Sequence, residues 1–214
     1  MPNEREEYLE KILANFLEPV KGIPFEIIIR ALYGVTVEKF DKDASWSIRV
    51  MHLIVESMRS ACYTVQSNPI EKPRPNEVGN AMEPFVIQSL KDKGLNAASP
   101  KTKTGKGKST GYPDILLEID DKRIFIEVKT YAADNYKTTQ RSFYLSPTDD
   151  PKVFENGYHL LVGFEIERNR NKYKPVAFEI VDLYGLECDM KSEFNSDNRR
   201  LYESNRLLFK EYVV

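Results

Sequence analysis

Two short apolar segments separated by three charged residues restrict the fold of this chain more than any other feature. Residues 114–119 (DILLEI) and 123–129 (RIFIEVK) have the length and the branched or aromatic side chains of β-strands, and residues 120–122 (DDK) are typical of a tight turn. Side chains alternate along a strand, so Glu127 and Lys129 point to one face while the aliphatic residues between them face the core. We therefore predict a β-hairpin that carries polar side chains on one face, at the end of its second strand.

Helical periodicity precedes this hairpin, and strand-like segments follow it. We predict helices at residues 3–17, from residues 43–45 to beyond residue 58, at 76–90 and at 198–210, and further strands at 158–167 and 175–183. Residues 25–30 (FEIIIR) fit either a helix or a strand, because periodicity does not separate the two over so short an apolar run. This order of elements indicates an α/β fold in which helices flank a central mixed β-sheet.

A proline-rich stretch divides the chain. Residues 68–75 hold three prolines, and prolines interrupt both helices and central strands. We therefore expect a helical N-terminal region at residues 1–72 and a core at residues 73–214.

The composition argues against several classes of protein. The 214 residues carry 31 basic and 33 acidic side chains, a net charge of −2, which is compatible with a basic cleft but not with a surface that is basic throughout. Two cysteines and two histidines are too few for a disulfide scaffold or a Cys-based zinc finger. No apolar run is long enough for a membrane span and the charged N-terminus does not resemble a secretory signal, so we expect a cytoplasmic protein without a membrane partner.

The predicted hairpin brings three charged side chains together. Asp114 starts the first strand and therefore lies beside Glu127 and Lys129 at the end of the second. Two carboxylates with a few waters suit Mg²⁺, and a lysine beside them can orient a water or stabilise charge on a phosphate. The alternative is an ordinary ion pair on a sheet edge after a Pro-Asp turn, which contributes little energy.

The same residues carry a family resemblance. Pro113-Asp114 followed by Glu127-Val128-Lys129 resembles the signature of the PD-(D/E)xK nuclease superfamily, and the helix predicted at residues 76–90 is similar to the first core helix of that superfamily. The resemblance implies a restriction-endonuclease-like core with a central mixed sheet, preceded here by the helical N-terminal region.

The resemblance also implies roles for individual residues. Asp114 and Glu127 would hold Mg²⁺ together with the main-chain carbonyl of Val128, and Lys129 would position the attacking water. The first core helix of the superfamily often carries an acidic residue near the active site. We expect that residue to be Glu83, with Glu77, nearer the start of the helix, as the alternative.

Three segments are candidates for contact with DNA. The expected contact residues are Lys101, Lys103, Lys106, Lys108 and Ser109 in a basic loop, Gln140, Arg141 and Ser142 after the signature, and Arg49 and Met51 in the long N-terminal helix. Lysines in a glycine-rich loop suit phosphates, glutamine and arginine read base edges, and an apolar wedge can kink a base step. The alternatives are a solvated loop, a polar loop held by its neighbouring aromatic residues, and a core methionine.

Taken together, the chain resembles a type II restriction endonuclease. The family implies a homodimer that cuts a short palindromic site in double-stranded DNA, leaves 5′-phosphate and 3′-hydroxyl ends, and has a cognate DNA methyltransferase as its partner. The N-terminal region would then serve dimerisation or grip the duplex. Two rivals remain at this point: a nuclease that selects branched or damaged DNA, and a non-catalytic DNA-binding module on the same core.

Overall fold

A computed structural model describes residues 4–17, 20–138, 143–191, 196 and 198–201 of the chain. The chain divides into two units, one made of Met1–Ile23 and Cys188–Val214 and the other of Pro24–Glu187. The first unit contains helices α1 (Glu4–Leu17) and α5 (Asn198–Leu201), and β1 (Ile23–Pro24) pairs with β9 (Glu187–Cys188) in a two-stranded sheet. The candidate site lies in the second unit.

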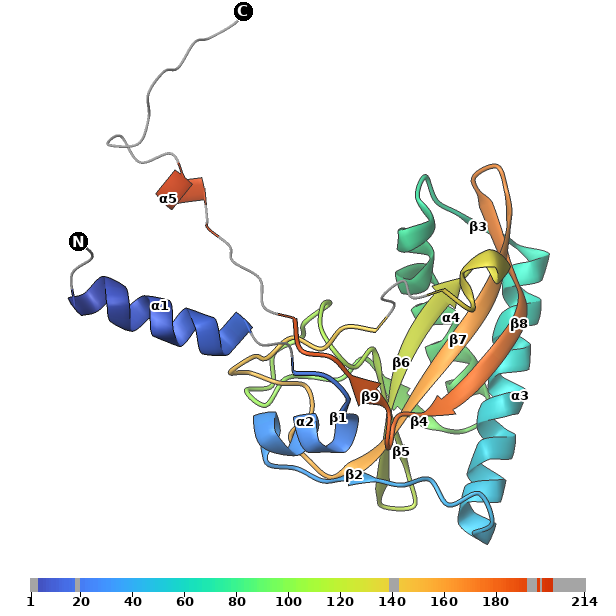
Figure 1. The fold of residues 1–214 in the computed structure, drawn as a ribbon. Coiled ribbons are helices and arrows are strands. Elements are labelled where there is room, and N and C mark those ends of the chain that lie inside the picture. Colours follow the sequence, from blue (N-terminus) through green and yellow to red (C-terminus); the bar gives the residue numbers. More distant parts are fainter. Residues whose placement is uncertain (1–3, 18–19, 139–142, 192–195, 197, 202–214) are drawn as a thin grey trace, which may run out of the picture. The chain divides into compact units, whose positions relative to one another are not determined.

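A mixed β-sheet forms the centre of this second unit (Figure 1). Its strands are β2 (Val37–Glu38), β3 (Ile70–Glu71), β4 (Asn96–Ala98), β5 (Ile115–Ile119), β6 (Lys122–Tyr131), β7 (Gly157–Asn169) and β8 (Lys172–Asp182). They lie in the order β3-β8-β7-β6-β5-β4, with β2 pairing in parallel with the start of β7. Because β6 and β7 are parallel while β5–β6 and β7–β8 are antiparallel, the prediction of a mixed sheet is confirmed.

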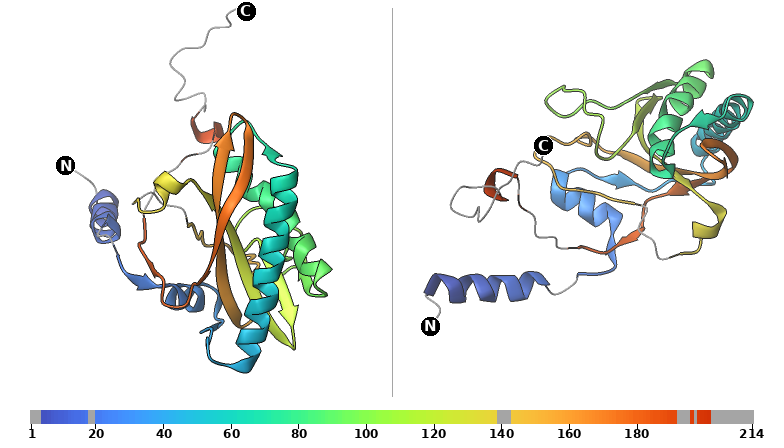
Figure 2. Two further views of the ribbon diagram at one scale, coloured as in Figure 1. Left: turned by 90° about the vertical axis from the view of Figure 1, so that its right-hand side faces the viewer. Right: turned by 90° about the horizontal axis from the view of Figure 1, so that it is seen from above.

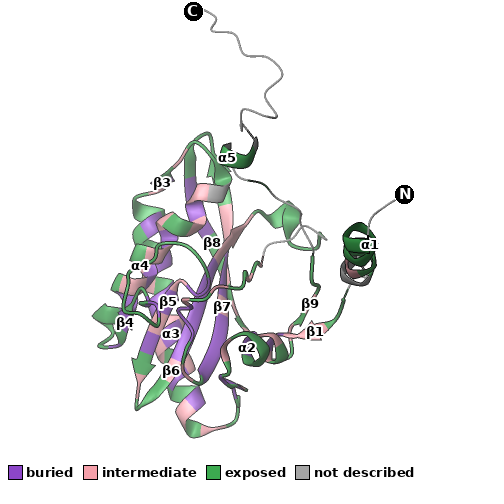
Figure 3. Ribbon diagram, turned by 90° about the vertical axis from the view of Figure 1, so that its left-hand side faces the viewer, coloured by how far each residue is buried: buried purple, intermediate pink, exposed green. Residues whose placement is uncertain are grey.

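Helices cover both faces of this sheet (Figure 2). Helices α3 (Ser45–Ser67) and α4 (Val78–Asp92), the second preceded by the 3-10 turn η1 (Pro75–Glu77), share a core with Ile124 and Ile126 of β6. Helix α2 (Phe25–Tyr33) contributes to a smaller core that contains Phe125, on the opposite face of the same strand. The middle strands β6 and β7 are therefore buried along most of their length (Figure 3).

The predicted hairpin is confirmed, although Lys122, expected in the turn, is the first residue of β6. Strands β5 and β6 pair from Ile115 opposite Ile126 to Ile119 opposite Lys122, which leaves a two-residue turn. Asp120 and Asp121 in this turn have φ values of 49° and 60°, the left-handed conformation that two-residue hairpin turns require and that aspartate tolerates.

The other predicted elements are found with small shifts at their ends. The strands predicted after the hairpin are β7 and β8, and the predicted helices are α1, α3 and α4. The undecided residues 25–30 belong to helix α2, in which Phe25 and Ile29 are buried one turn apart, and Gly34 in the left-handed conformation ends the helix. Of the predicted helix 198–210, residues 198–201 are helical and the rest lies outside the described residues. Within the described part of the chain, no helix is both long and apolar enough to cross a membrane.

Candidate active site

Asp114 lies directly before β5, at the end of the hairpin opposite the turn. Its backbone N–H donates to the carbonyl of Ile126 at 3.2 Å, and its Oδ2 accepts a hydrogen bond from the backbone N–H of Val128 at 2.8 Å. The hairpin ladder therefore continues one residue beyond β5, and the backbone of β6 holds the Asp114 carboxylate in place.

Glu127 and Lys129 lie beside this carboxylate, as the alternation of strand β6 predicts. Glu127 is only 4% exposed, and the ammonium of Lys129 donates to its Oε1 at 2.5 Å. Its other oxygen, Oε2, is buried without a hydrogen-bond partner among the described residues. Burial and the neighbouring charge of Asp114 raise the pKa of Glu127. A buried carboxylate oxygen without a donor is costly, so this oxygen is suited to accept a hydrogen bond from water or to bind a cation.

Helix α4 adds a third carboxylate. Glu83 is half-buried, and burial, followed by the charge of Asp114, raises the pKa of Glu83 to about 7. Pro84 follows it inside the helix, but α4 continues through this proline to Asp92. The structure therefore brings Glu83 into the charge cluster, whereas Glu77 lies in the 3-10 turn ahead of the helix.

Sequence reasoning missed Lys152, which belongs to the same cluster. This lysine is only 6% exposed, and its ammonium donates to the carbonyls of Gly111 at 2.7 Å and Pro113 at 2.9 Å. Burial lowers the pKa of Lys152, while Asp114, Glu127 and Glu83 oppose that shift. Lys152 lies in a polar segment (TDDPKVF) that carries no motif and only the tertiary structure places it here, so no signal in the sequence marks it.

A layer of aromatic rings supports the turn that leads into Asp114. Tyr112 and His159 stack with ring centroids 5.8 Å apart, and the Tyr112 hydroxyl and His159 Nδ1 form a hydrogen bond of 2.6 Å. Phe25 and Phe143 pack edge-on against Tyr112. Burial lowers the pKa of His159 to about 3, so its imidazole is neutral and serves packing.

Comparison with known proteins identifies the family of this chain. Residues 19–205 match the family model described as the type II restriction enzyme MjaV family. The chain belongs to this family. A curated relative, the type II restriction enzyme MjaV of Methanocaldococcus jannaschii, is 33% identical over 221 residues that cover 96% of this chain and 96% of the relative. Type II restriction enzymes are site-specific deoxyribonucleases, so DNA is the substrate and both rivals are set aside.

For a restriction enzyme, the placement of the basic loop is informative. Lys101, Lys103, Lys106, Lys108 and Ser109 are all exposed. The loop is held by hydrogen bonds of the Thr104 backbone N–H and hydroxyl to Asp150, at 3.0 and 2.7 Å, and of the Lys103 backbone N–H to the Pro151 carbonyl, at 2.9 Å. Because Lys152 follows these anchors and the charge of Lys108 acts on it, the structure brings the loop next to the carboxylate cluster.

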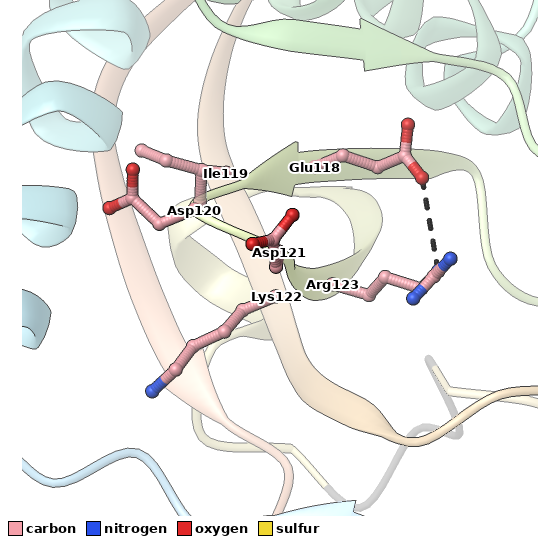
Figure 4. Close-up of a pocket in the computed structure, with 6 residues that line it drawn as sticks. All are labelled: Glu118, Ile119, Asp120, Asp121, Lys122 and Arg123. Carbon is pink, nitrogen blue, oxygen red and sulfur yellow. Dashed lines mark ion pairs between the residues drawn. The ribbon is translucent and has the colours of Figure 1, made fainter.

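The structure does not bring Arg49 and Met51 to the active site. Arg49 forms an ion pair with Asp120 in the hairpin turn, roughly 20 Å from Asp114 at about 3.3 Å per strand residue. Figure 4 shows a shallow pocket at this turn, where Asp120 and Lys122 point away from the ion pair of Glu118 and Arg123. Met51 is half-buried and packs against the core between α3, α4 and the sheet.

The third group of predicted DNA contacts is Gln140, Arg141 and Ser142, which lie outside the described residues. The next residue, Phe143, is half-buried against Phe25 and Tyr112. The chain is therefore anchored to the aromatic layer directly after these three positions.

Proposed function

We propose that this restriction enzyme hydrolyses double-stranded DNA at a short palindromic site in a Mg²⁺-dependent reaction on a PD-(D/E)xK core, leaving 5′-phosphate and 3′-hydroxyl ends. One observation carries the proposal: a buried carboxylate oxygen of Glu127 lacks a donor among the described residues, beside Asp114 and Lys129. This combination of hard oxygen ligands and a cation is suited to binding a metal and a phosphate together.

The available ligands fit Mg²⁺ better than a metal ion that is coordinated mainly by protein side chains. The described residues contain no group of three His, Cys, Asp or Glu side chains that could hold a metal ion. Mg²⁺ does not need such a group, because it keeps several waters and commonly uses one or two carboxylates. We assign Asp114, Glu127 and the carbonyl of Val128 as its protein ligands. When bound, Mg²⁺ would stabilise negative charge on the phosphate and lower the pKa of a coordinated water.

The side chains of the chain itself have distinct roles in this proposal. Lys129 has a partly exposed side chain, so its ammonium is available to orient the attacking water and to stabilise charge on the phosphate. Asp114 is held rigidly by the Val128 N–H and presents its carboxylate without reorganisation. Glu83, whose pKa is raised to about 7, completes the cluster from α4 by assisting a second metal or a water network.

The proposed DNA contacts are those expected from the sequence. We assign phosphate contacts to Lys101, Lys103, Lys106, Lys108 and Ser109, base recognition to Gln140, Arg141 and Ser142, and more distant duplex contacts to Arg49 and Met51. Exposed lysines next to the scissile phosphate increase affinity by releasing counterions.

A homodimer follows from the reaction. One site cuts one strand, so a palindromic duplex requires a two-fold partner. The N-terminal region, residues 1–72, is the element that we assign to dimerisation or duplex grip, and its helix α1 exposes three large apolar side chains, Tyr8, Leu9 and Leu13. Sedimentation equilibrium should give twice the chain mass of 24.8 kDa.

The decisive experiment is digestion of phage DNA by purified protein with Mg²⁺, beside the variants Asp114→Ala and Asp121→Ala. We expect discrete bands from the wild type and from Asp121→Ala, which changes an exposed aspartate at the other end of the same hairpin, and none from Asp114→Ala. Ligation of the products without prior kinase treatment tests for 5′-phosphate ends. A smear, cutting in EDTA, or full activity of Asp114→Ala would overturn the proposal.

A further inference from the structure

We propose that Lys152 is a positioning residue for DNA cleavage: its buried ammonium fixes the turn that carries Asp114 and balances the charge of the carboxylate cluster. The inference rests on the proposed function, because it assumes that Asp114 belongs to the catalytic site. It assigns a role to a residue that lies outside the PD-(D/E)xK signature.

The first support is the hydrogen bonding of the turn. Lys152 donates to the carbonyls of Gly111 and Pro113, the residues on either side of Tyr112, and Pro113 directly precedes Asp114. From the other side, Asp114 is held by the backbone of Ile126 and Val128. The backbone at Asp114 is thus held by strand β6 on one side and, through the preceding turn, by Lys152 on the other, and loss of the lysine releases the turn.

The second support is burial. Lysine is almost never fully buried unless it is paired, because removing an ammonium from water is costly. Lys152 is only 6% exposed. Its hydrogen bonds to two backbone carbonyls and the negative charges of Asp114, Glu127 and Glu83 compensate the cost of this burial. The charge of Lys152 is therefore part of the electrostatic balance of the site.

The third support is the way in which Lys152 itself is held. The two residues before it, Asp150 and Pro151, accept hydrogen bonds from Thr104 and Lys103 of the basic loop. Lys152 therefore connects the loop assigned to phosphate contact with the turn that carries the catalytic aspartate. A phosphate held by this loop is thereby placed in a fixed position relative to Asp114.

The test compares Lys152→Met with the wild type and with Lys122→Met, under enzyme excess, on a plasmid that the wild type cuts. Lys122 is a suitable control because its ammonium is a hydrogen-bond donor as well, here to the Tyr158 hydroxyl at 3.1 Å, but it lies at the far end of the hairpin. We expect the single-turnover rate constant of Lys152→Met at saturating Mg²⁺ to fall by about 10- to 100-fold, as for residues that orient metal ligands. Plasmid binding without metal should be unchanged, and Lys122→Met should cut at the wild-type rate.

The rate constant of cleavage reports how fast each active molecule cuts, and the amplitude of cleavage reports how many molecules are active. Together they distinguish a positioning role of Lys152 from a merely structural one. If Lys152 only stabilises the fold, Lys152→Met lowers the melting temperature and the amplitude of cleavage, while the rate constant of the remaining active molecules is unchanged. That result would overturn the inference. Lys152→Gln, which keeps one amide donor but no charge, replaces Lys152→Met if the methionine variant does not fold, and the same slow rate constant is expected.

Asp114→Ala, measured in parallel, distinguishes failure of the inference from failure of the proposed function. If Asp114→Ala is inactive and the Lys152 variants cut at the wild-type rate, only the role of Lys152 is wrong. If Asp114→Ala cuts at the wild-type rate, the proposed site is wrong and the inference falls with it.

Discussion

At the scale of single residues, Glu83 is the carboxylate whose role is most open to test. It is half-buried next to Asp114, whereas Glu77 lies six residues earlier in the 3-10 turn. We expect Glu83→Gln to slow single-turnover cleavage by about 10- to 100-fold, because it removes a charge that supports the metal ligands. Glu77→Gln should cut at the wild-type rate. A larger effect of Glu77→Gln would show that Glu77 is the helix carboxylate.

His159 makes the stability of the protein dependent on pH. Burial lowers the pKa of its imidazole from 6.5 to about 3, so below pH 6.5 the unfolded chain binds a proton that the folded chain does not. Between about pH 6.5 and about pH 3, this histidine therefore lowers the free energy of unfolding by up to about 1.4 kcal/mol per pH unit as the pH falls. Urea unfolding across this range measures the slope.

One substitution isolates the contribution of His159. His159→Gln should remove about one proton from the pH dependence of the free energy of unfolding between about pH 6.5 and about pH 3. Equal slopes for the wild type and His159→Gln would contradict the prediction.

At the scale of elements, the contact between β6 and β7 depends on a glycine. A Cβ atom at Gly157, the first residue of β7, would lie 2.7 Å from the backbone carbonyl of Arg123 and 3.0 Å from the ring of Phe125. Gly157→Ala should therefore destabilise the protein by about 1–3 kcal/mol through overpacking. Gly107→Ala, where a Cβ would meet open space, is the matched control and should be close to neutral. Denaturant unfolding that gives the same midpoint for both variants would show that the strands can separate.

Local signals predicted most of the elements, because each depends on neighbours in the sequence. The hairpin turn was predictable from Asp120-Asp121, since aspartate tolerates the left-handed conformation found there. Residues 25–30 could not be assigned from periodicity, because an apolar run of this length packs equally well as helix or strand. Burial of Phe25 and Ile29 under the aromatic layer decides in favour of a helix.

At the scale of the whole molecule, the basic loop should dominate the salt dependence of DNA binding. The double variant Lys106→Gln/Lys108→Gln should reduce the slope of log affinity against log salt by about 2, because each lost phosphate contact contributes about 0.9. Lys172→Gln/Lys174→Gln removes the same charge from the β7–β8 hairpin, where both lysines are paired with glutamates, and should leave the slope unchanged. Fluorescence anisotropy of labelled duplex without Mg²⁺ gives both slopes. Equal slopes for the two double variants would remove the loop from the DNA interface.

The proposed catalytic site shows which placements the sequence predicts and which it does not. Asp114, Glu127 and Lys129 were predictable because a hairpin with alternating side chains brings the start of one strand beside the end of the next. Lys152 was not, because its place depends on hydrogen bonds from Lys103 and Thr104, far away in the sequence, to the two residues that precede it. The distance of Arg49 from this site was not predictable either, because it follows from the ion pair of Arg49 with Asp120 at the far end of the hairpin.

The amino-acid sequence by itself therefore determined the hairpin, the three signature side chains, the mixed sheet with its helices and the expectation of a restriction enzyme. The hairpin, the placement of these side chains and the sheet follow from local periodicity and strand geometry, which act over a few residues. The expectation of a restriction enzyme comes instead from the resemblance of Pro113-Asp114 and Glu127-Val128-Lys129 to the PD-(D/E)xK signature. The tertiary structure alone decided that Glu83 joins the cluster, that a second lysine is buried behind Asp114 and that the basic loop lies next to both. Such placements depend on contacts between residues far apart in the chain, and burial and charge act only once those contacts exist.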